Sequence, residues 1–346
     1  MTVRAWAELL RVSALFTVPG DALAGAAARG LRPDRGTALA VGASLCLYEA
    51  GMALNDWADR DEDAIDRPHR PIPSGRIAPG AALAAAGALT AAGLGLAARA
   101  GRPALAVATG LAATVWAYDL RLKHTPAGPA AMAAARGLDL LLGATATGTA
   151  KTPKGSGPGP GPDPGAAARG GMLGGMRSAL PAAGLLGAHT YAVTAVSRHE
   201  AQGGSTTVPL AALAAVTALG AAALREPGGA LPKPGRPEDT LPHAPHGRTR
   251  TAGLSHRPRA TPASATPRLL LTALTGSYFR TAAGPLLHAA LNPSPPLTQR
   301  AVGGGIRAMI PLQAALAARA GAAGTGLAVM GLVPLARTLA RKVSPT

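Results

Sequence analysis

Apolar residues recur along the chain in long blocks that short polar stretches separate. A helix rises about 1.5 Å per residue and must cross roughly 30 Å of hydrocarbon to span a membrane. About nine blocks meet that length, namely residues 8–28, 37–57, 80–99, 103–121, 128–148, 179–197, 207–224, 297–318 and 321–339. The pattern predicts an all-α polytopic membrane bundle of about nine transmembrane helices.

One further apolar stretch, 268–290, carries Arg280 and His288. It is compatible with a span, a re-entrant segment or a helix on the membrane surface. Residues 151–175 and 225–267 are instead rich in proline with glycine or basic residues, and they predict disordered inserts. We expect the whole chain, 1–346, to form a single transmembrane domain with these two inserts.

Composition supports a bundle packed through small side chains. The 346 residues include 45 glycines, and aromatic residues make up only 3 %. Small residues let helices approach closely in a bilayer. The net charge of +17 is spread over loops and tails, with few aromatic rings to stack on bases, so we expect no nucleic-acid partner. Contact with membrane lipids explains the basic residues more simply.

Six of the seventeen carboxylates fall within eleven residues: Asp56, Asp59, Asp61, Glu62, Asp63 and Asp66. On one continuous helix, Asp56, Asp59 and Asp63 would lie on a single stripe and repel one another. A divalent cation would relieve this repulsion, and Mg²⁺ prefers such hard oxygen ligands. The alternative is a solvated acidic helix end.

A basic segment follows the acidic cluster directly. Pro68, Pro71 and Pro73 exclude a helix there and predict an extended path that carries Arg67 and Arg70. Rigidly held arginines suit bidentate contacts with phosphate. Contact with lipid headgroups is the alternative.

Two other span ends carry polar groups. The fourth block ends with Tyr118, Asp119 and Lys123. Lys123 would contact a diphosphate, and Tyr118 and Asp119 would orient that diphosphate. The alternative is that these residues are interfacial membrane anchors. Arg198 and Glu200 end the sixth. Within the fifth block, Arg136 and Asp139 should face the bundle interior, as an ion pair that fixes packing or as a substrate contact.

The run from Asn55 through Asp56, Asp59 and Asp63 to Arg67-Pro68-x-Arg70-Pro71 resembles the first signature of the UbiA superfamily of intramembrane prenyltransferases, and Tyr118-Asp119-x-x-Leu122-Lys123 resembles its next element. The resemblance implies a helical bundle around a central, lipid-open cavity that binds Mg²⁺ and a prenyl diphosphate. It implies metal ligands at Asp56, Asp59 and Asp63, and catalytic roles for these three, Tyr118 and Asp119. It also implies substrate contacts from Asn55, Arg67, Arg70, Lys123, Arg198 and Glu200.

One departure from the family pattern concerns its second aspartate motif. Ser197 and Ala201 stand where aspartates are expected, and Glu200 is the nearby carboxylate. Together with Ile310-Pro311-Leu312-Gln313, this resembles a divergent branch of the family, and it puts a second metal ion in doubt.

These observations predict a Mg²⁺-dependent enzyme that transfers an isoprenyl group to an unidentified small molecule or lipid. Its alternatives are a non-catalytic scaffold that binds prenyl diphosphate or lipid, and a small transporter. Basic residues are slightly more frequent on the side of the acidic motif, which predicts an integral protein of the cell membrane with that motif on the cytoplasmic side.

Overall fold

The computed structural model describes residues 3–148, 164–225 and 265–334, and these are helical nearly throughout. The prediction of an all-α membrane bundle is confirmed. In chain order the elements are α1 (Val3–Leu9), η1 (Val12–Thr17), α2 (Pro19–Ala28), α3 (Arg35–Ala58), α4 (Arg60–Asp66), α5 (Pro79–Ala100), α6 (Arg102–Ala117), η2 (Tyr118–Leu122), α7 (Gly128–Ala146), α8 (Pro164–Ser197), α9 (Thr207–Leu224), α10 (Ala265–Leu291), α11 (Pro295–Arg319) and α12 (Ala323–Met330).

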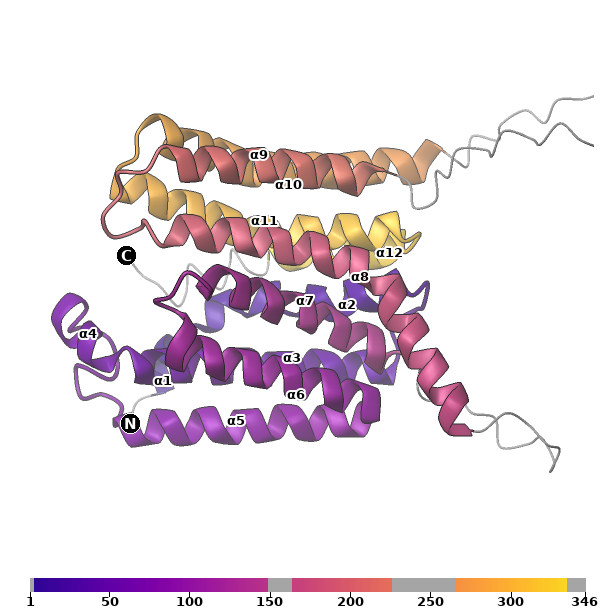
Figure 1. Ribbon diagram of the computed structural model, residues 1–346, viewed down its shortest axis with the longest axis horizontal. Helices are drawn as coiled ribbons and strands as arrows, with labels where there is room; N and C mark the ends of the chain where they lie inside the picture. Colours follow the sequence, from indigo (N-terminus) through magenta and orange to yellow (C-terminus); the bar gives the residue numbers. More distant parts are fainter. Residues whose placement is uncertain (1–2, 149–163, 226–264, 335–346) are drawn as a thin grey trace, which may run out of the picture.

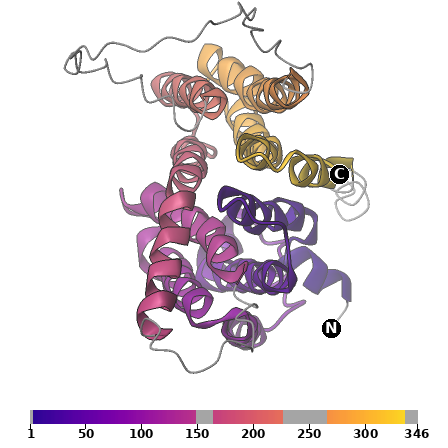
Figure 2. The ribbon, with the colours of Figure 1, turned by 90° about the vertical axis from the view of Figure 1, so that its right-hand side faces the viewer.

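The long helices lie side by side, roughly parallel to one axis, with α5 at one edge of the bundle and the α9–α10 pair at the other (Figure 1). Viewed along that axis, the N-terminal and C-terminal helices form two groups (Figure 2). The groups meet where α2 and α7 contact α8 and α11. This meeting line leaves room for the central cavity described below.

Five helices are long and apolar enough to cross a membrane: α3, α5, the part of α8 from Gly174, α9 and α11. The predicted count of nine is not confirmed. Predicted span 8–28 is wrong as one helix, because Arg11 adopts a left-handed conformation (φ 47°) and divides it into α1, η1 and α2. Of 321–339, α12 covers only Ala323–Met330, and 335–339 lie outside the described residues.

The open stretch 268–290 lies within α10, a continuous 27-residue helix that packs against α9 and α11. It is therefore a full-length member of the bundle. The first predicted insert is partly wrong, because α8 already begins at Pro164. The remaining insert residues, 151–163 and 226–264, lie outside the described residues.

Small residues bring helix backbones into contact, as the composition predicts. A Cβ added to Gly143 on α7 would lie 2.3 Å from the Cα of Ala22 on α2, and one added to Gly25 would lie 2.1 Å from the carbonyl oxygen of Leu140. No larger side chain fits at either glycine without separating α2 from α7.

Asp34 begins α3 with a capping box. Its carboxylate accepts a hydrogen bond from the backbone N–H of Thr37, and its own N–H donates to the Thr37 hydroxyl. The same carboxylate accepts from the N–H of Gly148, 2.9 Å away, just beyond α7. One side chain thus satisfies a helix start and ties two helices together at the end of the bundle away from the acidic motif.

Candidate active site

The acidic motif lies where α3 ends. The helix stops at Ala58, Asp59 has φ −87° and ψ 4°, and α4 starts at Arg60. The prediction of three carboxylates on one continuous stripe is therefore wrong. The break has a physical benefit, because it lets the like charges separate and meet different cations.

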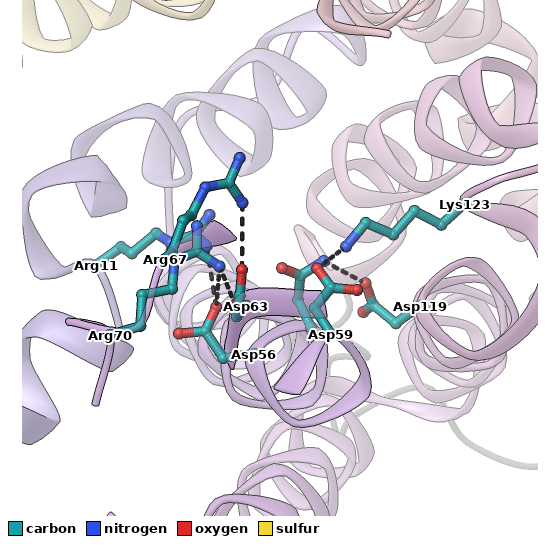
Figure 3. A network of polar contacts seen from close by, with 9 residues as sticks. Arg11, Asp56, Asp59, Asp63, Arg67, Arg70, Asp119 and Lys123 are labelled. Carbon is teal, nitrogen blue, oxygen red and sulfur yellow. Dashed lines mark hydrogen bonds and ion pairs between the residues drawn. The ribbon is translucent and has the colours of Figure 1, made fainter. Parts of the chain in front are cut away.

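Asp56 and Asp63 form the first group and are 4 % and 1 % exposed. The Nη1 of Arg70 lies 2.6 Å from the Oδ2 of Asp63 and 3.5 Å from the Oδ1 of Asp56. Arg67 contacts the other oxygen of Asp63 at 3.4 Å, and Arg11 contacts Asp56 at 3.0 Å. Figure 3 shows the three guanidinium groups gathered over the two carboxylates.

Asp59 points to the other side, toward Lys123 and Asp119 (Figure 3). Lys123 forms an ion pair with Asp59, and the Asn55 amide donates to the Oδ1 of Asp119 at 3.0 Å. Asp119 and Lys123 are positioned by η2, a single π-helical turn that ends α6. Such turns often occur at functional sites. We call these two groups together the rim cluster: Arg11, Asn55, Asp56, Asp59, Asp63, Arg67, Arg70, Asp119 and Lys123.

The segment that carries Arg67 and Arg70 is not extended, so that prediction is wrong. It consists of successive turns, with backbone hydrogen bonds from Arg70 to Arg67, from Ser74 to Arg70 and from Ile77 to Pro71. The prolines do exclude a regular helix, but turns bring the chain back over α3 and so place Arg70 against the carboxylates.

The remaining predicted residues lie beside the rim cluster. Tyr118 and Ser197 line the cavity. Arg198 donates to the carbonyl oxygen of Thr125, which joins two loops on this face. Glu200 is half-buried, and burial raises the pKa of its carboxyl, while the nearby positive charge of Arg67 acts in the opposite direction.

A cavity of about 460 Å³ opens beneath the rim cluster between α3, α6, α7, α8 and α11. Its outer part is lined by Arg11, Asn55, Tyr118 and Asp119, and apolar residues such as Val115 and Val302 follow. A pocket of this size can enclose a small ligand. Of the rim carboxylates, Asp119 lines the cavity itself. Asp56, Asp59 and Asp63 do not line it, but their side chains are at most 10 % exposed, so they do not extend into open solvent.

Deeper in the cavity, Arg136 and Asp139 face inward as predicted, but they are not each other's closest partner. The Nε of Arg136 lies 3.0 Å from the Oδ2 of Asp21 on α2. Asp139 instead accepts from the hydroxyl of Ser44 on α3. The i, i+3 spacing could not reveal either partner, since both come from other helices.

Sequence reasoning missed several residues at the mouth. Arg11 lies 45 residues from its partner Asp56, and no local pattern connects the two. Within the described part of the chain, Asp59, Glu62 and His124 offer ligand atoms within 4.8 Å of one another. The oxygen donors at the mouth fit a hard divalent cation such as Mg²⁺, although the carboxylates are divided between two groups.

Comparison with known proteins identifies the fold and the family. The UbiA prenyltransferase family matches residues 13–225, well over half of the chain. The chain belongs to this family. Its apolar helices and this membership make it an integral membrane protein.

Two kinds of relatives accompany this match: curated proteins that are similar in sequence, and solved structures that are similar in fold. Digeranylgeranylglyceryl phosphate synthase of Methanopyrus kandleri is 37 % identical over 129 residues, which cover 36 % of this chain and 46 % of the relative. The chain thus matches less than half the length of this relative. A solved structure of a UbiA homologue from Archaeoglobus fulgidus bound to GPP and Mg²⁺ has a TM-score of 0.51 at 16 % identity, covering 94 % of this chain and 99 % of the other. A structure from work on digeranylgeranylglyceryl phosphate synthase in membranes has a TM-score of 0.54 at 15 % identity, covering 92 % and 98 %.

Proposed function

We propose that this UbiA family member transfers an isoprenyl group from a prenyl diphosphate to a small-molecule or lipid acceptor within the membrane, with Mg²⁺ as cofactor. The observation that carries the proposal is the rim cluster. Four cationic side chains and four buried or nearly buried carboxylates gather beside a partly open cavity with mostly apolar walls. A diphosphate with an apolar tail matches both parts of that arrangement.

The cationic side chains would act on the leaving group. When the allylic carbon–oxygen bond breaks, the bonding electron pair stays with the diphosphate and the carbon becomes cationic. Arg67, Arg70 and Lys123, together with Arg11, would stabilise the charge that develops on the diphosphate oxygens. They already point toward carboxylates, so little reorganisation is needed when phosphate oxygens arrive.

Asp56, Asp59 and Asp63 would hold Mg²⁺, and Asp119 and Tyr118 would orient the diphosphate. When bound, Mg²⁺ supplies further charge stabilisation for the leaving group. Asn55 would fix the carboxylate of Asp119, to which it already donates. The apolar cavity would keep water from the cationic carbon until the acceptor reacts.

The proposal also includes the domain organisation of the enzyme and its orientation in the membrane. The whole chain would act as one domain, and the rim cluster would lie on the cytoplasmic side of the cell membrane. Arg198 would contribute to substrate binding from the neighbouring loop, and Glu200 would modulate that binding through its charge interaction with Arg67. A non-catalytic scaffold remains the second candidate, because Ser197 and Ala201 replace the aspartates expected in the second motif.

Purified full-length protein incubated with Mg²⁺ and radiolabelled prenyl diphosphates of graded length tests the proposal. We expect release of pyrophosphate and a labelled lipid or small-molecule product when membrane extract supplies the acceptor. Asp59→Ala should abolish release without unfolding the bundle, whereas Asp61→Ala, at an exposed position on α4, should not. Retained turnover in Asp59→Ala would contradict the metal assignment, and binding without pyrophosphate release would favour the scaffold.

A further inference from the structure

The last three described helices carry positive charge without any negative charge. Residues 265–334, which contain α10, α11 and α12, include five arginines and no aspartate or glutamate. At the rim cluster, by contrast, every cationic side chain faces a carboxylate. Two of the five arginines, Arg300 and Arg307, are exposed on α11. Within the part of the chain that the structure describes, neither side chain forms an ion pair or a hydrogen bond.

An unpaired arginine on α11 is costly because of its position along the helix. α11 is one of the helices that are long and apolar enough to cross a membrane, and Arg307 lies at the middle of its 25 residues. The Cα of Arg307 is therefore roughly 18 Å along the axis from the start of α11. A charged side chain within a span needs either a partner or a route to the membrane surface.

The side chain of Arg307 extends toward the start of α11. A Cβ added to Gly303 would lie 3.2 Å from the Nη1 of Arg307 and 3.8 Å from its Cζ. The guanidinium group therefore lies over the bare backbone of Gly303, one helical turn from its own Cα. Arg300 occupies the same stripe of the helix, seven residues before Arg307. Two arginines thus flank a position that has no side chain.

This stripe borders the open side of the cavity. Val302 and Ile306 precede Gly303 and Arg307 in the sequence, and both line the cavity. Ile306 is also 40 % exposed, so the cavity is accessible from the side at this point. An apolar ridge that faces the cavity and a basic stripe that faces outward therefore run next to each other along α11.

We propose that this face of α11 binds a net-negative phospholipid of the surrounding bilayer. Its phosphate would lie over Gly303, between Arg300 and Arg307, because planar guanidinium groups form bidentate hydrogen bonds with phosphate oxygens. One acyl chain would pack against Ile306 and cover the open side of the cavity.

The composition of these helices favours a net-negative headgroup over a zwitterionic one. The cation of a zwitterionic headgroup would approach two arginines, and α10, α11 and α12 offer no carboxylate to compensate it. A net-negative headgroup brings no such cation and is attracted by both arginines. Binding of this lipid does not require the proposed transfer reaction.

Quenching of fluorescence by brominated lipids tests where the chain binds. Full-length Ile306→Trp is reconstituted in phosphatidylcholine vesicles in which about a tenth of the lipid, either phosphatidylglycerol or phosphatidylcholine, carries brominated chains. Quenching needs contact, so its strength reports which lipid occupies the position. We expect at least threefold stronger apparent binding of phosphatidylglycerol. Phe279→Trp, at a 43 % exposed position on α10, is the matched control and should show no preference.

Further changes in the Ile306→Trp protein separate the parts of the site. Arg300→Gln combined with Arg307→Gln should abolish the preference for phosphatidylglycerol. Gly303→Leu keeps both charges but fills the place of the Arg307 guanidinium, and should at least halve the preference. Arg99→Gln removes an exposed arginine at the end of α5 and should leave the preference unchanged.

Several results would overturn the proposal. One is equal quenching of Ile306→Trp by the two brominated lipids, and another is an unchanged preference in the double variant. A preference of equal size in Phe279→Trp would show that the lipid gathers around the whole chain, whose net charge is +17. Circular dichroism checks that each variant is folded. Should Gly303→Leu not fold, the double variant and Arg99→Gln still decide the question.

Discussion

The rim cluster and a second group deeper in the bundle, which we call the inner cluster, use the same chemistry in different surroundings. The inner cluster consists of Asp21, Ser44, Arg136, Asp139 and Gln313. Both pair aspartates with arginine side chains, and in both the carboxylates are buried. At the mouth, however, the side chains of Arg67, Arg11 and Arg70 are 50 %, 39 % and 21 % exposed. At the inner end, the side chain of Arg136 is 10 % exposed and that of Asp21 is not exposed at all.

This difference in exposure indicates what each cluster can do. A partly exposed arginine can exchange a carboxylate for a phosphate, because water and neighbouring acids compensate both arrangements. A buried arginine has no such freedom, since removing its partner leaves a charge in an apolar medium. The mouth is thus suited to binding, and the inner end to holding helices together.

The largest expected effect follows from breaking the inner cluster. Arg136→Leu leaves Asp21 buried without its cation and should lower the free energy of unfolding by about 3–5 kcal/mol. Unfolding of the purified protein in mixed micelles, followed by circular dichroism, measures the loss. Arg67→Leu at the mouth, where half of the side chain is exposed, should cost less than about 1 kcal/mol. Equal losses in the two variants would remove the distinction between the clusters.

Arg70 should show the reverse pattern. It is the one side chain with ion pairs to both Asp56 and Asp63 in the part of the chain that the structure describes. Arg70→Leu should lower kcat/KM for pyrophosphate release at least about a hundredfold, because a preorganised cation is lost from the leaving group. Arg60→Leu is the control, since Arg60 stacks on Trp57 and donates to its carbonyl oxygen. A loss of similar size in Arg60→Leu would show that turnover responds to any charge removed near α4.

The two clusters also differ in how well the sequence predicted them. At the mouth, Asp56, Asp63, Arg67 and Arg70 lie within fifteen residues, so their charges alone indicated that they meet. The turn at Asp59 escaped prediction, because helical spacing assumes that α3 continues. Its cause is tertiary, since the carboxylate pairs with Lys123 on another element.

The sequence revealed only part of the inner cluster. Arg136 and Asp139 stood out as charges within an apolar block, but Asp21 and Gln313 are 292 residues apart and meet only in the folded bundle. The fold class was predicted, because hydropathy reports on membrane helices directly. Helix number was harder, because short helices such as α2 and α12 lie in apolar blocks long enough for a full span.

A smaller effect is expected at the end of the bundle away from both clusters. Asp34→Ala removes the cap of α3 and the contact with Gly148, and should cost about 1 kcal/mol of unfolding free energy without changing diphosphate affinity. Exposed Asp66 provides the control as Asp66→Ala. A change in affinity in Asp34→Ala would show that the two ends of the bundle are coupled.

Lowering the pH should reduce the unfolding free energy of the wild-type protein in the same way as Asp34→Ala does. Burial raises the pKa of the Asp34 carboxyl, but hydrogen bonds from the amides of Thr37 and Gly148 outweigh it and hold the pKa below its ordinary value. Its stabilisation is therefore present above the unfolded pKa of about 3.9 and is lost as pH falls through the lower folded value. The unfolding free energies of wild type and Asp34→Ala should converge in that range, and a constant difference would contradict the assignment.

The smallest effect concerns Glu200, which modifies the rim cluster from outside. Burial raises the pKa of this carboxyl, and the charge of Arg67 only partly opposes the rise. Above that pKa, Glu200 is negative and competes with the diphosphate for Arg67. At a pH above that pKa, Glu200→Gln should therefore bind farnesyl thiolodiphosphate, a non-reacting analogue of farnesyl diphosphate, two- to threefold more tightly than wild type. The gap should close as pH falls and Glu200 becomes neutral. Because titration of the ligand affects both proteins equally, the ratio of their Kd values isolates Glu200. If the ratio of the Kd values stays constant with pH, then the charge of Glu200 does not affect how Arg67 binds the diphosphate, or Arg67 does not bind the diphosphate.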